Sequence, residues 1–206
     1  MELTLFIVVC VPLSLLLLLE KGSSRQLLLF LVVGMFVALF LVNVSHYFIE
    51  LSGGDFKQYS IYVAPIGEEA FKALPVFAYA LIFKPSKERL IAMGAAVGFG
   101  FAIYENISYV AMGNFDVGLF WAIARGASTA LMHALCTCAV SFGAFYFQRN
   151  KIFLLCLVCG LLCLSATFHS LYNLMMYSHY YIGMLFVPPL IFAALFIARK
   201  RTARLA

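Results

Sequence analysis

The stretch SIYVAPIGEEAFKALPVFAYALIF, residues 60–83, carries three ionisable side chains inside an apolar run long enough to cross a lipid bilayer. They are Glu68, Glu69 and Lys72. Each charge near the centre of a membrane helix costs roughly 2.5–3.5 kcal/mol. Such groups are retained where they face the interior of a helical bundle and serve a function there. The stretch therefore predicts both a membrane helix and the place of a functional site.

Composition points to the same class of protein. The chain has 206 residues, of which 65% are hydrophobic and 11% are charged, far from the balance of a soluble domain. The apolar runs are long and lack the period-two alternation of membrane strands, so they favour an all-α, polytopic helical bundle. We expect one integral membrane domain over residues 1–206, without an appended soluble domain.

Seven membrane spans can be read between short polar breaks. We place them at Leu3–Leu19, Leu27–Ile49, Ser60–Phe83, Leu90–Met112, Val117–Phe147, Ile152–Met176 and Tyr180–Ala198. The fifth run is too long for a single crossing, so we expect an interfacial or re-entrant lead-in at Phe115–Ala124 and a true span from Gly126. Spans three to six, residues 60–176, form the predicted catalytic part.

Loop charges predict the orientation in the membrane. Eleven Lys and Arg residues follow the odd-numbered spans, whereas only Lys57 lies in a loop on the other side. Basic residues concentrate on the cytoplasmic side of membrane proteins. We therefore expect the N-terminus outside and the C-terminus in the cytoplasm. The formal net charge of +5 follows from this asymmetry; it fits contact with the lipid bilayer and needs no nucleic-acid partner.

The next three spans carry ionisable side chains at a matching depth. Glu105, His133 and His169 lie in spans four, five and six. With a rise of about 1.5 Å per residue, Glu68 and Glu69 lie roughly 13 Å from the outer boundary, and Glu105 lies about 10 Å from it. The two histidines fall at similar depths. Four helices are therefore expected to bring acids and imidazoles into one water-accessible cavity in the outer half of the bilayer.

Helical spacing refines this arrangement. Glu68 and Lys72 are four residues apart with the acid first, which is the favourable order for an ion pair. His169 and Asn173 are also four residues apart and share a helix face. Each feature alone has a structural explanation, since a buried ion pair neutralises itself and a histidine can hydrogen-bond a neighbouring helix. Their coincidence at one depth favours a functional site.

Span four also carries small residues on the side of Glu105. Gly94, Gly98 and Ala102 recur at every fourth position. Small side chains at this spacing let a neighbouring membrane helix approach closely. We expect another helix to pack against this seam.

Carboxylates and imidazoles in a wet membrane cavity suit hydrolysis in two ways. In the first, Glu69, His133 and His169 hold Zn²⁺ and leave a fourth position for a water molecule, which the ion makes easier to deprotonate. In the second, no metal takes part: a glutamate accepts a proton from water, while a histidine and Asn173 stabilise the oxyanion. The sequence leaves both open, because it has no His-Glu-x-x-His pair that would favour zinc.

Four segments, in order along the chain, resemble the motifs of PrsW-type intramembrane proteases. That family has a Glu-Glu-x-x-Lys motif, a Gly-Phe segment ending in Glu-Asn, and two histidine motifs. The matching segments are EEAFK (68–72), GFGFAIYEN (98–106), MHA (132–134) and HSLYN (169–173). A more distant resemblance extends to the CAAX protease and bacteriocin-immunity protease group, whose second motif carries His where this chain has Glu105.

The resemblance implies an intramembrane endopeptidase of metallo- or glutamic type. It implies a membrane-anchored protein as substrate, such as a single-pass anti-sigma factor, cut near the outer membrane face. Carried over residue by residue, Glu68 or Glu69 activates water or binds the metal, and Asn173 donates to the oxyanion or supports the site. The residues that the resemblance assigns to the catalytic site are Glu68, Glu69, Glu105, His133, His169 and Asn173, with Lys72 and Asn106 in support.

Two other functions fit a polytopic bundle. A proton-coupled carrier also uses membrane carboxylates and histidines, but it would distribute them along a path through the bilayer. The inner half of this bundle is nearly free of charge. A non-catalytic scaffold or receptor would not need the paired glutamates Glu68 and Glu69. The sequence therefore favours the peptidase over both alternatives.

Overall fold

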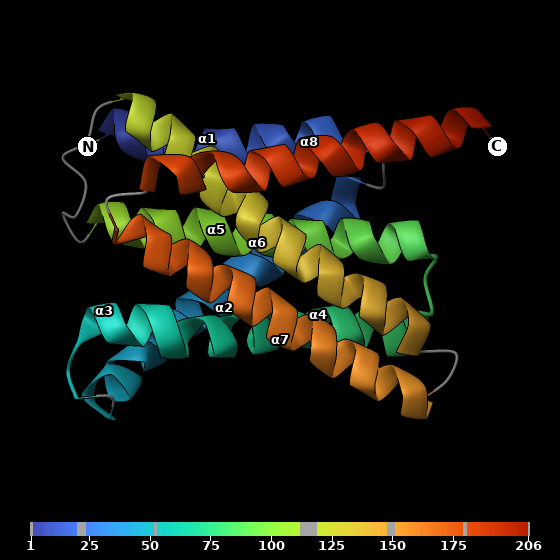
Figure 1. Cartoon of the computed structure of the whole chain (residues 1–206), viewed down its shortest axis with the longest axis horizontal. Coiled ribbons are helices and arrows are strands. Elements are labelled where there is room, and N and C mark those ends of the chain that lie inside the picture. The colour runs from blue at the N-terminus through green and yellow to red at the C-terminus, as the bar shows by residue number, and fades with distance from the viewer. Residues whose placement is uncertain are drawn as a thin grey trace.

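A computed structural model describes residues 2–19, 24–51, 53–111, 119–147, 151–178 and 181–205. In these ranges the chain is all-α, with eight α-helices and one π-helical turn, η1 (Figure 1). The elements in order are α1 (Glu2–Leu19), α2 (Ser24–Leu51), α3 (Phe56–Gln58), η1 (Tyr59–Val63), α4 (Ala64–Phe83), α5 (Lys87–Ala111), α6 (Leu119–Phe147), α7 (Lys151–Met176) and α8 (Tyr181–Leu205).

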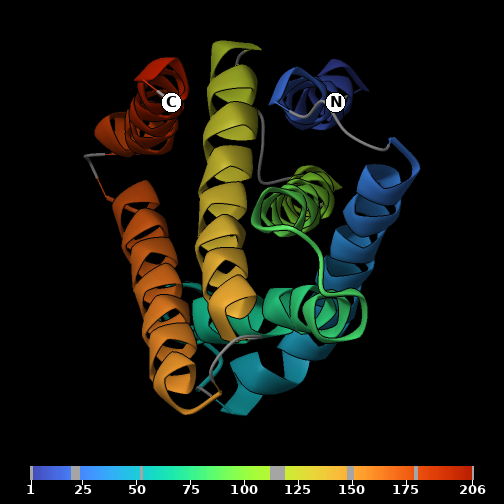
Figure 2. The same ribbon diagram turned by 90° about the vertical axis from the view of Figure 1, so that its right-hand side faces the viewer.

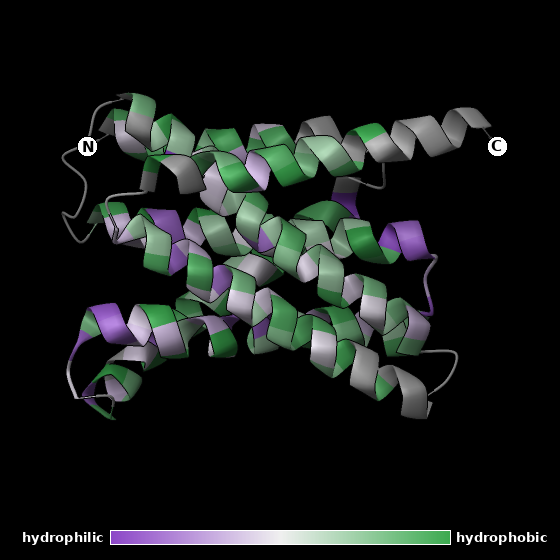
Figure 3. Cartoon of the chain, in the orientation of Figure 1, coloured by the Kyte–Doolittle hydropathy of each residue, from purple (hydrophilic) through white to green (hydrophobic). Residues whose placement is uncertain are grey.

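Helix α5 lies in the centre of the bundle. It packs against α1, α2, α4 and α6, and most of its side chains from Leu90 to Ile103 are buried. Figure 2 looks along α5 and shows α2 and α6 on either side of it, with α4 below. Helix α7 packs on both α4 and α6, so α4 to α7 surround a common interior. Figure 3 shows that hydrophobic residues dominate the helices, while hydrophilic ones gather at α3 and at the beginning of α5.

The helices are those of a multi-pass membrane protein, but the prediction of seven spans is wrong. Among the described residues, four segments are long and apolar enough to cross a bilayer: Arg25–Ser45, Lys87–Ala111, Ala122–Phe147 and Val158–Met176. The apolar parts of α1 and α8 that the structure describes, Leu3–Leu16 and Leu185–Leu195, are too short. Helix α4 carries three charged side chains within its 20 residues, which lowers its hydropathy. The side of the membrane on which each terminus lies stays a prediction.

The fifth predicted span also changes. Helix α6 is continuous from Leu119 to Phe147, so Leu119–Ala124 belongs to it and is not a separate interfacial segment. This part of the chain contains neither proline nor glycine, the residues that most often end a helix. Residues 115–118 of the expected lead-in lie outside the described residues.

Glycines let α5 approach two neighbouring helices at backbone distance. A Cβ atom added at Gly98 would lie 2.6 Å from the carbonyl oxygen of His133 on α6. A Cβ atom at Gly100 would collide with the backbone of Leu31 on α2. Because Cβ atoms are not found this close to backbone, only glycine fits at these positions. The small-residue seam expected on this helix therefore packs against α6.

Substituting Gly98 by alanine is expected to lower the free energy of unfolding by about 1–3 kcal/mol, because the new methyl group has to displace the α6 backbone. The measurement is denaturation in detergent micelles, followed by the loss of helical circular dichroism. Gly160→Ala on α7 is the matched control, since a Cβ atom there meets no described heavy atom within 4 Å. Equal stability of Gly98→Ala and the wild-type protein would contradict this packing.

Candidate metal centre and active site

Four helices contribute ionisable side chains to one buried cluster. The contributors are Glu68, Glu69 and Lys72 from α4, Glu105 from α5, His133 from α6 and His169 from α7. Helix α4 begins directly after η1 with Pro65 in its first turn, where the missing N–H leaves no helical hydrogen bond unmade. The side chains of Glu69, Lys72 and the two histidines are at most 1% exposed, whereas those of Glu68 and Glu105 keep 15%.

Glu69 holds both Lys72 and His169. Its Oε1 atom lies 2.6 Å from Nζ of Lys72 and 2.9 Å from Nδ1 of His169. A carboxylate oxygen only accepts hydrogen bonds, so Nδ1 of His169 carries the proton and donates it. In the neutral imidazole, Nε2 of His169 is then left with its lone pair. The ammonium group of Lys72 supplies the counter-charge that the buried carboxylate needs.

His133 lies between Lys72 and Glu105. Its Nδ1 atom is 2.8 Å from Nζ of Lys72, and its Nε2 atom is 2.9 Å from Oε2 of Glu105. Because an ammonium group has donors only, Nδ1 accepts from Lys72 and Nε2 donates to Glu105. The ring centroid lies 4.9 Å from that of Phe101 and 4.8 Å from that of His169. These contacts fix the orientation of the His133 imidazole.

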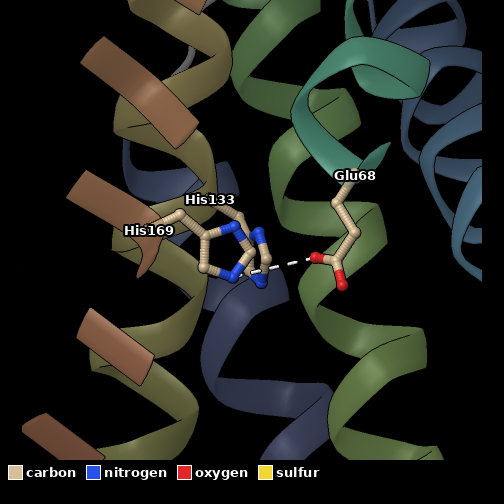
Figure 4. Close-up of side chains that lie close together, drawn as sticks. All are labelled: Glu68, His133 and His169. Atoms are coloured by element: carbon tan, nitrogen blue, oxygen red, sulfur yellow. Dashed lines mark ion pairs between the residues drawn. The ribbon is translucent and has the colours of Figure 1, made fainter. Parts of the chain in front are cut away.

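Glu68 and the two histidines form the group that is best placed to bind a metal ion. One ligand atom from each residue lies within 4.8 Å of the others, and Figure 4 shows the three side chains pointing toward one another. Oε2 of Glu68 is 3.7 Å from Nε2 of His169. Both atoms are buried, and neither has a hydrogen-bond partner in the described part of the chain. Two unpaired acceptors facing each other are unfavourable unless a cation or a proton lies between them.

A comparison with known families agrees with this cluster. Residues 22–198 match the family described as PrsW family intramembrane metalloprotease. The chain belongs to the PrsW family. No curated protein and no solved structure matched the chain. The resemblance that four short motifs indicated is thereby confirmed, and this PrsW-family protein is an intramembrane peptidase.

The metalloprotease family implies a metal ion, and the donor atoms of this PrsW-family protein fit one. Two imidazoles and one carboxylate are a ligand set of catalytic zinc sites, which keep a further position for water. With zinc–ligand bonds of about 2.0–2.2 Å, two donors on a tetrahedral ion lie roughly 3.4 Å apart. The 3.7 Å between Oε2 of Glu68 and Nε2 of His169 is close to that value. His133 would bind through one of its two ring nitrogens, which would then give up its present hydrogen bond to Lys72 or to Glu105.

The geometry differs from two details inferred from the sequence. The sequence suggested Glu69 as a metal ligand together with the two histidines. In the structure, Glu69 bonds to Lys72 and His169. It is Glu68 that lies with the two histidines in the group that could hold a metal ion. The ion pair expected between Glu68 and Lys72 is formed by Glu69 and Lys72, three residues apart. Both differences have one cause. Successive helix residues point about 100° apart, so only one of the two glutamates can turn toward Lys72 in the interior.

Asn173 and Asn106 lie beside the cluster in different surroundings. Nδ2 of Asn173 donates to the carbonyl oxygen of Ser60 in η1 at 2.8 Å, so this amide links α7 to the π-helical turn. Asn106 is 1% exposed, and its two amide atoms have no hydrogen-bond partner among the described residues. Asn173 therefore has a positioning contact, and the oxyanion role inferred for it stays a prediction.

Two side chains next to the site were not singled out from the sequence. The ring centroid of Phe101 lies 4.7 Å from Nζ of Lys72, a cation–π contact. The hydroxyl of Tyr172 donates to Ser128 at 3.1 Å and joins α7 to α6 beside His169. Phe101 is one helical turn from Glu105, so helical spacing could have placed it on the site. Tyr172 is three residues from His169 in the HSLYN segment, so the same spacing places it on the side of α7 that faces the site.

A cavity of about 370 Å³ lies against the cluster. Its walls come mainly from α2, η1, α4 and α5, with Phe56 of α3 and Asn173 of α7, and they include Glu68 and Glu105. These are the two carboxylates of the cluster that keep some exposure. The cavity therefore gives access to the acidic side of the cluster.

Proposed function

We propose that this protein hydrolyses a peptide bond of a membrane-anchored protein, with Zn²⁺ held by Glu68, His133 and His169. The observation that carries the proposal is the pair of buried atoms Oε2 of Glu68 and Nε2 of His169, which face each other at 3.7 Å without a described hydrogen-bond partner. When bound, the ion would polarise the scissile carbonyl and lower the pKa of a water molecule to about 7.

In this proposal Glu69 and Lys72 orient the two imidazoles. Glu69 accepts the proton of Nδ1 in His169 and so keeps Nε2 unprotonated on the side of Glu68. Lys72 neutralises Glu69, and before the ion binds it donates to Nδ1 of His133, which holds that ring between Lys72 and Glu105. Loss of a carboxylate that supports a ligand histidine typically lowers metal affinity or activity by about 10–100-fold.

Glu105 is proposed as the proton acceptor. Its carboxylate lines the cavity and keeps 15% exposure, so a water molecule and a substrate peptide can reach it. A general base in this place accepts a proton from the attacking water and returns it to the leaving amine. Before the ion binds, the hydrogen bond from Nε2 of His133 to Oε2 of Glu105 holds the carboxylate in place.

The substrate is proposed to be a single-pass membrane protein, such as an anti-sigma factor in a bacterial plasma membrane. The support is that the cluster lies within a bundle of membrane helices and that mainly apolar side chains line its cavity. The loop charges further favour a cut near the outer membrane face. We propose that residues 1–206 act as one domain in this reaction.

Metal analysis of the purified protein tests this function. The wild-type protein in detergent is expected to contain about one zinc ion per chain. His169→Ala removes one of three ligands and is expected to lower the zinc content at least about 10-fold. Chelation is expected to stop cleavage of a co-expressed single-pass protein, and added zinc is expected to restore it.

Glu50→Gln on α2 is the control for these measurements, because Glu50 is exposed and lies outside the cluster. It is expected to keep both the metal and the activity. Full cleavage by protein shown to be free of metal would refute the zinc assignment and favour the glutamate route instead.

A further inference from the structure

We propose that the cavity beside Glu68 and Glu105 is a subsite for one large apolar side chain next to the scissile bond, and that Gly67 sets the size of this subsite. The inference rests on the proposed peptidase function, because it takes the cluster as the place where the peptide bond is cut. It adds a specificity determinant that the family assignment does not contain.

The cavity has the size of a ligand pocket and mainly apolar walls, so it has room for a large side chain together with the backbone beside it. Its volume of about 370 Å³ falls in the range of ligand pockets, about 300–1,000 Å³. Leu41 of α2, Phe71 of α4 and Phe101 of α5 give it aliphatic and aromatic walls. Glu68 and Glu105 also line the cavity. A peptide carbonyl that reaches them therefore places its neighbouring side chain against apolar walls.

The rim of the cavity indicates where the occupant comes from. Phe48, Tyr62 and Ile66 line it and are 48%, 63% and 62% exposed. Phe48 lies three residues past the span Arg25–Ser45, and Tyr62 and Ile66 lie in η1 and α4, next to the spans. The rim is therefore an apolar entrance beside the membrane spans, which favours a segment of a membrane-anchored substrate over a soluble polar peptide.

Gly67 stands directly before Glu68 on α4 and lines this cavity. A Cβ atom added there meets no described heavy atom within 4 Å. Gly67 therefore differs from Gly98, where a larger side chain would collide with the backbone of α6. Glycine is less favourable than alanine inside a helix, and helix packing does not explain it here. Its effect on the structure is to leave open space at a position that lines the cavity, next to Glu68 in the chain.

The occupant that fits is Leu, Met or Phe from an extended stretch of the substrate. Carbonyl groups inside an intact α-helix are already hydrogen-bonded, so the segment that is cut has to be unwound locally. Apolar side chains are then exposed next to the scissile bond, and an apolar subsite binds them. One methylene group in a hydrophobic pocket changes specificity by about 10–200-fold. A leucine side chain at position 67 would occupy this space.

The test uses a synthetic library of single-span peptides that are randomised at their central positions, in detergent micelles. Cut sites are mapped by mass spectrometry for the wild-type protein, Gly67→Leu, Gly67→Ala and Gly160→Leu. The wild-type protein is expected to prefer Leu, Met or Phe next to the cut. Gly67→Leu is expected to lower the ratio of large to small residues there by at least about 10-fold. Gly160→Leu adds the same side chain in open space on α7 and is expected to keep the wild-type ratio.

The possible outcomes separate the two proposals. A wild-type preference that Gly67→Leu leaves unchanged would overturn the subsite and keep the peptidase; this result is expected if a lipid chain fills the cavity. A wild-type protein that cuts no library peptide would overturn the proposed function and the subsite with it. If Gly67→Leu does not accumulate as folded protein, Gly67→Ala is the deciding variant. It is expected to shift the preference toward small residues by a smaller amount. The absence of any shift in Gly67→Ala would contradict the subsite.

Discussion

Replacement of Glu68 by glutamine is expected to lower the cleavage rate by about 10³-fold or more, the upper part of the range for loss of a group that takes part in the chemistry. Glutamine keeps the size of the side chain but loses the negative charge that balances a metal ion. It also offers an amide N–H₂ group where Oε2 of Glu68 now faces Nε2 of His169. The measurement is the initial rate of cleavage of a single-pass substrate, together with the zinc content of the purified variant.

Glu50→Gln is the matched control for this substitution. It makes the same chemical change at an exposed glutamate on α2 and is expected to leave the rate within a factor of about two, as is usual for surface substitutions away from a site. If Glu68→Gln cleaves the substrate at the wild-type rate, Glu68 takes no part in catalysis. Normal zinc content combined with a lost rate would assign Glu68 to proton transfer and not to metal binding.

Replacement of Lys72 by methionine is expected to be the most destabilising single change at the site. It leaves the carboxylate of Glu69 buried without its counter-charge, and breaking a buried ion pair in this way costs about 3–5 kcal/mol. The side chain of Lys72 is fully buried, and its Nζ atom also donates to Nδ1 of His133. The measurement is the free energy of unfolding from denaturation in detergent micelles.

The double variant Lys72→Met/Glu69→Gln provides the internal test of this cause. Removing both charges is expected to recover part of the lost stability, because no unpaired charge is then buried. Lys57→Met is the control at an exposed lysine, whose contact with the ring of Tyr177 lies outside the cluster. If the double variant is no more stable than Lys72→Met, loss of packing and not loss of charge balance explains the effect.

The gathering of charged groups could be predicted from the sequence because membrane insertion makes each charge costly. That cost predicted an interior cluster, and helix rise predicted that four helices would contribute to it at one level. The structure brings Glu68, Glu69, Glu105, His133 and His169 together as expected. The seam at Gly98 was predictable for a similar reason, since small residues at helical spacing mark close approach.

Which of the two glutamates pairs with Lys72 and which faces the histidines could not be predicted. Glu68 and Glu69 are adjacent in sequence, and both lie within one turn of Lys72, at four and three residues. Their roles depend on how α4 is rotated against α5, α6 and α7, and this rotation is a property of the packed bundle. The number of spans was overestimated for another reason: the described apolar parts of α1 and α8 are too short to cross a bilayer, and α4 carries three charged side chains.

Backbone-level contact on both faces of α5 has a mechanical consequence for a peptidase that admits a polypeptide. The glycine positions hold the backbones of α2 and α6 directly against α5, so separating these three helices would break backbone-level packing. Widening the cavity without breaking these contacts would then require a movement of α4, whose Gly67 makes no such contact. An outward swing of α4 would carry Glu68, Glu69 and Lys72 away from the imidazoles. Entry of the substrate and hydrolysis could then not happen at the same moment. The hydrolytic centre would be complete only after α4 had closed around a bound polypeptide.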